Sequence, residues 1–184
     1  MSTPSKIPIR NIYYLLSYAW DDYSAGDWEA LRSEECPDLA NLFAVVLSEA
    51  IRRLIRHDGL HREYVPRTDE LAVLRGKVDF AAGIKRQTQR SGRAVCRFDE
   101  LDHDVLHNQI LRATIEILLK AEGLEAPNRE RLLGCKRWFA RVSTISLRAS
   151  LFPRVQIAGN ARQYRFLLNL CELIFHSLLP TEEL

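Results

Sequence analysis

The chain has 184 residues, of which 47% are hydrophobic and 27% are charged, and it contains only 8 Gly and 7 Pro. This composition is typical of a folded globular domain and excludes disordered, collagen-like and coiled-coil proteins. The formal net charge is only +2, and the longest apolar stretches end well short of the roughly 20 residues that a membrane-spanning helix needs.

Two helices are predicted near the start of the chain. Apolar residues recur at helical spacing over residues 12–22 and again, more regularly, over residues 39–57. Asp38 precedes the second helix as an N-cap, and Gly59 follows it as a left-handed stop. The sequence therefore predicts an amphipathic helix over 39–57 that packs one continuous apolar stripe against a core.

Between residues 60 and 101 the apolar period changes from helical to alternating. Residues 77–80 and 94–99 each alternate apolar with polar side chains, which is typical of strands. Residues 81–91 predict a short basic helix or turn that ends at Gly92. The region is expected to form a small antiparallel sheet or a projecting hairpin.

Helical spacing resumes after residue 101. A helix over 106–121 is expected to be capped by Asp102 and stopped by Gly123. Further elements are predicted in the remaining chain: a helix over 128–142, a strand over 145–151 and a last helix over 161–179.

The expected fold class is α+β and mainly helical, with about five helices around a small antiparallel β element or projecting hairpin. We expect one domain over residues 1–184. Its helical lobe comprises 7–59 and 102–180, and its basic, β-rich projecting segment comprises 60–101.

Charged residues are segregated along the chain. Residues 75–97 carry seven bases against one acid and residues 128–165 nine bases against one acid, whereas residues 1–50 and 99–125 are acidic. Most of the bases are arginine, which favours bidentate contacts to phosphate or carboxylate. Two interpretations stay open: an interface with nucleic acid or an acidic protein surface, or pairing of acidic and basic segments within one fold.

No complete catalytic motif is present in the sequence. A PD-(D/E)xK nuclease needs an acid two residues before a lysine, and none of the five lysines has one. The spacing around Gly76 and Lys77 excludes a phosphate-binding Walker A loop. The cysteines are spaced as neither a zinc clamp nor a disulfide framework, so we expect small apolar residues in a reducing cytoplasm.

His103 and His107 are the strongest metal candidates. With Asp104 they resemble an HExxH zinc helix in which Asp replaces Glu, and two histidines at i and i+4 of a helix can share a metal. The competing interpretation is that His103 and Asp104 belong to a helix cap and first turn.

Five short motifs follow one another between residues 7 and 165. They are residues 7–20, which include Arg10, Asn11, Tyr13 and Tyr14; Gly59 and Leu60 with Arg62 and Tyr64; residues 74–80, which include Gly76 and Asp79; residues 97–111, which include Phe98 and Asp99; and Asn160 with Arg162, Tyr164 and Arg165. Together they resemble the amino-terminal portion of McrC, the endonuclease subunit of the McrBC 5-methylcytosine restriction system.

The resemblance implies a type IV restriction subunit of the prokaryotic cytoplasm that docks on a hexameric McrB-like AAA+ GTPase and stimulates GTP hydrolysis. Contact with modified-cytosine DNA would be made through the complex, and no membrane is involved. The family's PD-(D/E)xK nuclease domain would lie outside these 184 residues, so this chain alone is expected to be non-catalytic. No cofactor is expected in it; GTP and Mg²⁺ would belong to the partner GTPase and the nuclease domain.

Segment 60–101 is then the expected contact with the partner ring. Seven basic residues are the candidate contacts: Arg75, Lys77, Lys85, Arg86, Arg90, Arg93 and Arg97. In the competing interpretation Arg75, Asp79, Arg97 and Asp99 pair with one another across strands. The alternative functions are a stand-alone basic nucleic-acid-binding domain and a metalloenzyme centred on His103 and His107.

Overall fold

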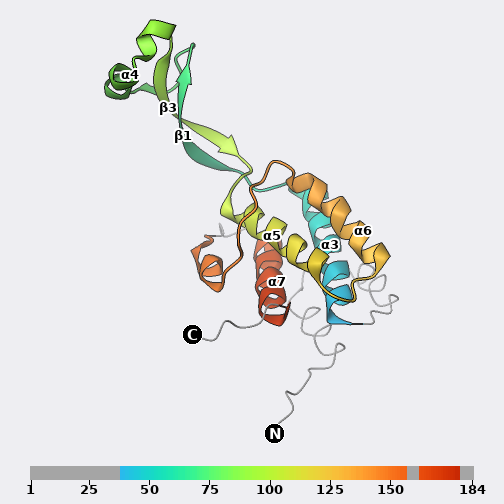
Figure 1. The fold of residues 1–184 in the computed structure, drawn as a ribbon. Coiled ribbons are helices and arrows are strands. Elements are labelled where there is room, and N and C mark those ends of the chain that lie inside the picture. Colours follow the sequence, from blue (N-terminus) through green and yellow to red (C-terminus); the bar gives the residue numbers. More distant parts are fainter. Residues whose placement is uncertain (1–37, 157–161, 179–184) are drawn as a thin grey trace. The chain divides into compact units, whose positions relative to one another are not determined.

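The computed structural model describes residues 38–156 and 162–178 (Figure 1). Its helices are α3 (Leu39–His57), α4 (Phe80–Arg86), α5 (Leu106–Lys120), α6 (Ala126–Lys136) and α7 (Arg162–Leu178), its strands are β1 (Glu63–Leu71), β2 (Lys77–Val78) and β3 (Ala94–Asp102), and its short 3-10 helices are η1 (Thr88–Ser91), η2 (Arg137–Phe139) and η3 (Ala149–Arg154). The predicted α+β, mainly helical class is confirmed. The helix predicted over 12–22 lies outside the described residues.

The described chain divides into two compact units. Residues 61–105 form one unit, here called the sheet unit, and the described residues on either side of it form the other, here called the helical unit. No helix among the described residues is long and apolar enough to cross a membrane.

The helical unit is built around the apolar stripe of α3. Phe43, Leu47 and Ile51 are completely buried, together with side chains of α5, α6 and α7. Helix α3 packs against α6 and α7, and α5 packs against α7 (Figure 1). At about 1.5–3 kcal/mol for each fully buried large apolar side chain, this cluster is the main source of stability in the unit.

A buried polar cluster holds the start of α3. The Asp38 carboxylate accepts from the Asn41 backbone N–H at 2.9 Å, which confirms the predicted N-cap. The completely buried Asn41 side chain donates to the Gly123 carbonyl at 2.9 Å and accepts from the Glu125 N–H at 3.0 Å and the Asn128 amide at 2.9 Å. The amide of Asn41 thus joins α3 to the connection between α5 and α6.

The sheet unit contains a three-stranded antiparallel sheet in the order β1-β3-β2. Strand β1 pairs with β3 over its whole length, from Glu63 opposite Asp102 to Leu71 opposite Ala94. Strand β2 is short and pairs only Lys77–Val78 with β3. The middle strand β3 supplies the buried side chains of the sheet, Val95 and Cys96.

The strand predicted over residues 77–80 is wrong beyond Val78. The Asp79 side chain accepts from the Ala82 backbone N–H at 2.9 Å and so starts α4, which places Phe80 in a helix. The basic helix or turn predicted over 81–91 is confirmed as α4 followed by η1, and Gly92 ends it with a φ of 66°. Strand β2 has only two residues before the N-cap of α4. So short a strand leaves too few alternating positions for the sequence to show where it ends.

Asp102 does not cap the next helix. It is the last residue of β3, its side chain accepts from the Asp104 N–H at 3.0 Å and pairs with Arg67, and α5 begins only at Leu106. An Asp side chain can accept a hydrogen bond from a nearby backbone N–H either at the start of a helix or in a turn. Asp102 does so in a turn. Gly123 has a φ of 76°, as the stop prediction requires.

The strand predicted over 145–151 is wrong. Residues 144–148 have no regular secondary structure, and η3 follows them. Ile145 and Leu147 nevertheless pack against the core cluster, whereas Thr144 and Ser146 are exposed. An extended segment lying on a helical core gives the same alternation as a strand, because the period of two reflects burial and needs no strand partner.

The described cysteines are buried thiols. Cys96, Cys135 and Cys171 are free and inaccessible, which confirms the apolar interpretation for these three; Cys36 lies outside the described residues. Burial raises the pKa of Cys135 to about 11 and that of Cys171 to about 12.

Candidate partner interface

Two of the sequence motifs meet in the sheet unit. Gly76, at the end of the β1–β2 connection, has a φ of 64°, and a Cβ built on it overlaps the Arg97 carbonyl oxygen and lies 2.8 Å from the Phe98 Cβ. Only glycine fits this backbone conformation and this close approach. Motif 74–80 is therefore fixed directly onto motif 97–111.

Asp79 joins the same two motifs. One carboxylate oxygen caps α4, and the other pairs with the Arg97 guanidinium from β3. The hydrogen bond from the Ala82 N–H, and next the positive charge of Arg97, hold the pKa of Asp79 below its ordinary value of 3.8. Asp79 thus orients α4 relative to the sheet.

The lowered pKa of Asp79 makes the sheet unit sensitive to acid. A carboxylate with a depressed pKa contributes stability that is complete above 3.8 and is lost as the pH falls below it. In an NMR titration of the wild type, the Ala82 amide shift is expected to follow this ionisation with a midpoint below 3.8. Asp79→Asn keeps an oxygen for the cap but removes the charge, so the titration is expected to vanish. A midpoint above the ordinary value contradicts the assignment.

Arg75 is held by two contacts on β3. Its guanidinium carbon lies 4.2 Å from the centroid of the Phe98 ring, and Nη1 lies 3.2 Å from a carboxylate oxygen of Glu100. Together with the ion pair between Arg97 and Asp79, these contacts show that carboxylates of the same unit neutralise part of the basic segment. Asp99, the fourth residue of the cross-strand interpretation, is exposed on β3.

Glu70 engages two more of the predicted contact residues. Its carboxylate lies 3.4 Å from Arg86 Nη1, and its backbone carbonyl accepts from Arg93 Nη2 at 2.8 Å. All seven basic residues are exposed, and three of them have neither an ion pair nor a side-chain hydrogen bond within the described part of the chain: Lys77, Lys85 and Arg90. These three cations have the greatest freedom to meet an external partner.

Helix α4 presents its large apolar side chains to solvent. Phe80 and Ile84, one helical turn apart, are 72% and 64% exposed, whereas Gly83 is buried against the Thr88 side chain. This reverses the usual arrangement of an amphipathic helix. Sequence reasoning missed both residues because it assigned Phe80 to a strand; the i, i+4 apolar pair beside a glycine was the available signal.

Motif residues of the helical unit have internal partners. The buried Tyr164 hydroxyl donates to Asn108 Oδ1 at 2.8 Å, and the Tyr164 ring meets His107 edge-on with centroids 6.0 Å apart. His107 Nε2 lies 3.0 Å from the Gln156 carbonyl oxygen. Arg162 is the first residue of α7. Five predicted motif residues lie outside the described residues: Arg10, Asn11, Tyr13, Tyr14 and Asn160.

The proposed zinc helix is not formed. His103 lies before α5, which begins at Leu106, so His103 and His107 do not share a helical face. The i, i+4 argument for a shared metal requires both residues on one continuous helix. The helical metal motif is therefore wrong as a prediction.

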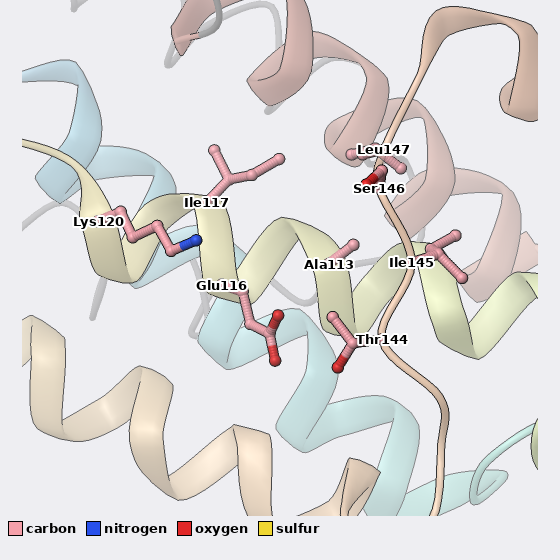
Figure 2. Close-up of a pocket in the computed structure, with 8 residues that line it drawn as sticks. All are labelled: Ala113, Glu116, Ile117, Lys120, Thr144, Ile145, Ser146 and Leu147. Carbon is pink, nitrogen blue, oxygen red and sulfur yellow. The ribbon is translucent and has the colours of Figure 1, made fainter.

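A pocket of about 400 Å³ lies in the helical unit between α5 and residues 144–147. Figure 2 shows Glu116 and Lys120 of α5 on its wall opposite the extended segment. Partial burial would raise the pKa of Glu116, but hydrogen bonds from Lys136 and Arg112 outweigh burial and lower it. A carboxylate held ionised by two cations is a structural link between α5 and α6, not a poised general acid.

Two solved structures share this fold. The chain matches a chain in the cryo-EM structure of the Thermococcus gammatolerans McrBC complex with a TM-score of 0.71 and 24% identity, covering 88% of this chain and 49% of that one. It also matches a chain in the half-complex from a tetradecameric assembly of T. gammatolerans McrB AAA+ hexamers with bound McrC, with a TM-score of 0.70 and 23% identity, covering 88% and 40%. The chain therefore shares the fold of these two chains.

Sequence comparison identifies the family. The family described as McrBC 5-methylcytosine restriction system component matches residues 10–183. The type IV methyl-directed restriction enzyme EcoKMcrBC of Escherichia coli (strain K12) is 31% identical over 177 residues, which are 95% of this chain and 50% of that protein. The chain therefore belongs to the McrBC restriction-system component family, as an McrC-like protein. It spans half the length of this E. coli relative.

Proposed function

We propose that this chain is the part of an McrC-like subunit that docks on a hexameric McrB-like AAA+ GTPase and stimulates its GTP hydrolysis. Family membership over residues 10–183 supports a role in restriction of modified-cytosine DNA. One structural relative comes from an assembly of McrB AAA+ hexamers with bound McrC, which supports the partner. GTP and Mg²⁺ would be bound by the GTPase, a nuclease domain outside these residues would cut DNA, and the complex would act in the cytoplasm.

The exposed cations of the sheet unit carry the proposal. Within the described residues, Lys77, Lys85 and Arg90 form no ion pair, whereas the other predicted contact arginines of this unit are bound internally. Unpaired cations on a small folded unit are suited to a complementary acidic protein surface, and such complementarity mainly sets the association rate and the choice of partner.

Charge reversal tests this docking. The triple variant Lys77→Glu, Lys85→Glu and Arg90→Glu is expected to lower the stimulation of the cognate GTPase by about tenfold or more at low salt, because like charges then oppose one another. GTP hydrolysis is measured at saturating GTP over a range of chain concentrations, and complex mass is measured in parallel.

A matched control reverses three exposed cations of the helical unit. Lys120→Glu, Arg148→Glu and Arg154→Glu change the net charge equally and affect exposed residues without ion pairs in the described structure. Equal stimulation by both triple variants would show that the sheet unit is not the docking site. Absence of any stimulation by the wild type would refute the proposed function itself.

The second candidate function is direct nucleic-acid binding by the helical unit. Trp138 in η2 is 41% exposed and is flanked in sequence by the exposed Arg137 and Arg141. An accessible aromatic ring between arginines is suited to base stacking and phosphate contact. This function requires DNA affinity without any partner protein, falling steeply as salt is raised.

A further inference from the structure

The exposed face of α4 is not needed for the stability of the sheet unit. Phe80 and Ile84 are 72% and 64% exposed, so neither side chain is packed into the core of the sheet unit. Helix α4 is held instead by its Asp79 cap and by the packing of Gly83 on Thr88. An isolated helix of 7 residues has little stability of its own, so these contacts keep it folded.

A second exposed apolar pair lies in the same unit. Val73 and Leu74, in the connection between β1 and β2, are 80% and 66% exposed. Single exposed apolar residues are ordinary, but with Tyr64 and Leu101 this unit exposes six large ones, which indicates a surface that another molecule covers.

The surrounding charge identifies the kind of occupant. The exposed cations Lys77 and Lys85 lie close in sequence to Phe80 and Ile84, and Arg90 follows in η1. A second copy of this chain would bring these cations against their own equivalents, which opposes self-association through this face. Nucleic acid would engage the cations and could stack a base on the Phe80 ring, but it would leave the aliphatic Ile84 side chain without a matching contact.

We propose that Phe80 and Ile84 insert into an apolar depression with an acidic rim on a subunit of the McrB-like GTPase ring, and that Lys77 and Lys85 pair with that rim. This inference rests on the docking proposed above and specifies which side chains hold the complex together. The apolar pair sets the lifetime of the complex, since buried anchors mainly control dissociation, and the cations set its rate of formation.

The test measures the affinity of the full chain for the cognate McrB-like protein loaded with a non-hydrolysable GTP analogue, at low and at high salt. Phe80→Ser with Ile84→Ser is expected to weaken binding by about 30-fold or more at both salt concentrations, because apolar contacts resist screening. Lys77→Glu with Lys85→Glu is expected to weaken binding strongly at low salt and much less at high salt.

The control is Leu133→Ser, which replaces an apolar residue of α6 that is 47% exposed and is expected to bind as the wild type does. Circular dichroism and thermal unfolding establish that each variant is folded.

Binding of the Phe80 and Ile84 double variant at wild-type affinity overturns this inference while leaving the docking proposal intact. Wild-type chain that fails to bind refutes both. A concentration-dependent dimer of the chain alone that is abolished by the double variant would assign the face to a second copy, and would also overturn the inference.

Discussion

Gly76→Ala is expected to destabilise the sheet unit by about 3 to 5 kcal/mol. Two costs add at this position. The backbone has a φ of 64°, which an L-residue adopts only with strain, and the new Cβ overlaps the Arg97 carbonyl oxygen. Relief requires β2 to move away from β3, which breaks the pairing of Lys77 with Arg97.

Gly92 offers the matched control. Its φ of 66° is nearly the same, but a Cβ built there meets no atom within 4 Å. Gly92→Ala should therefore carry only the backbone cost, about 1 kcal/mol. Hydrogen exchange of β1 and β3 amides, which reports opening of the sheet unit within the full chain, measures both variants. Equal protection in the two alanine variants would contradict the close approach seen at Gly76.

Asn41→Ala is expected to destabilise the helical unit by about 3 kcal/mol. The loss exceeds that of an ordinary hydrogen bond, because the Asn41 amide is completely buried and serves several partners at once. Its removal leaves the buried Asn128 amide without this partner, and the Gly123 carbonyl loses its donor as well. A buried polar group left unsatisfied costs the full price of its desolvation.

The effect of Asn41→Ala is measured as the free energy of unfolding in denaturant, followed by far-ultraviolet circular dichroism. Asn169→Ala is the matched control, since Asn169 is exposed on α7 and its replacement should change stability by less than about 0.5 kcal/mol. If both variants unfold alike, the buried network at the start of α3 has no energetic importance.

Sequence reasoning was most successful where one local signal sufficed. The stripe of α3, its Asp38 cap and the left-handed Gly59 together define a 19-residue helix, and the structure places it at Leu39–His57 as predicted. The errors arose where two structures share one local signal. Asp102 accepts from a backbone N–H in a turn rather than at a helix start, and residues 144–148 alternate in burial without forming a strand.

At the candidate interface, too, the local sequence predicted some features and left others undecided. The sequence identified the basic segment and its seven candidate contacts, but it could not separate the arginines that carboxylates hold internally from the cations that form no ion pair in the described structure. That separation depends on partners distant in sequence: Glu100 for Arg75, Glu70 for Arg86, and Asp79 for Arg97. Ion pairs between such positions form only when β1, β2 and β3 are in register.

By itself, the amino-acid sequence determined the family, the fold class and the location of the basic segment, because ordered motifs, hydrophobic periodicity and net charge are properties of the chain read in one dimension. Only the tertiary structure decided that Gly76 must lie against β3, that Asn41 is buried among polar partners and that Phe80 and Ile84 face outward. The physical reason is that burial and pairing depend on which distant segments come together, and periodicity within one segment carries no information about its neighbours.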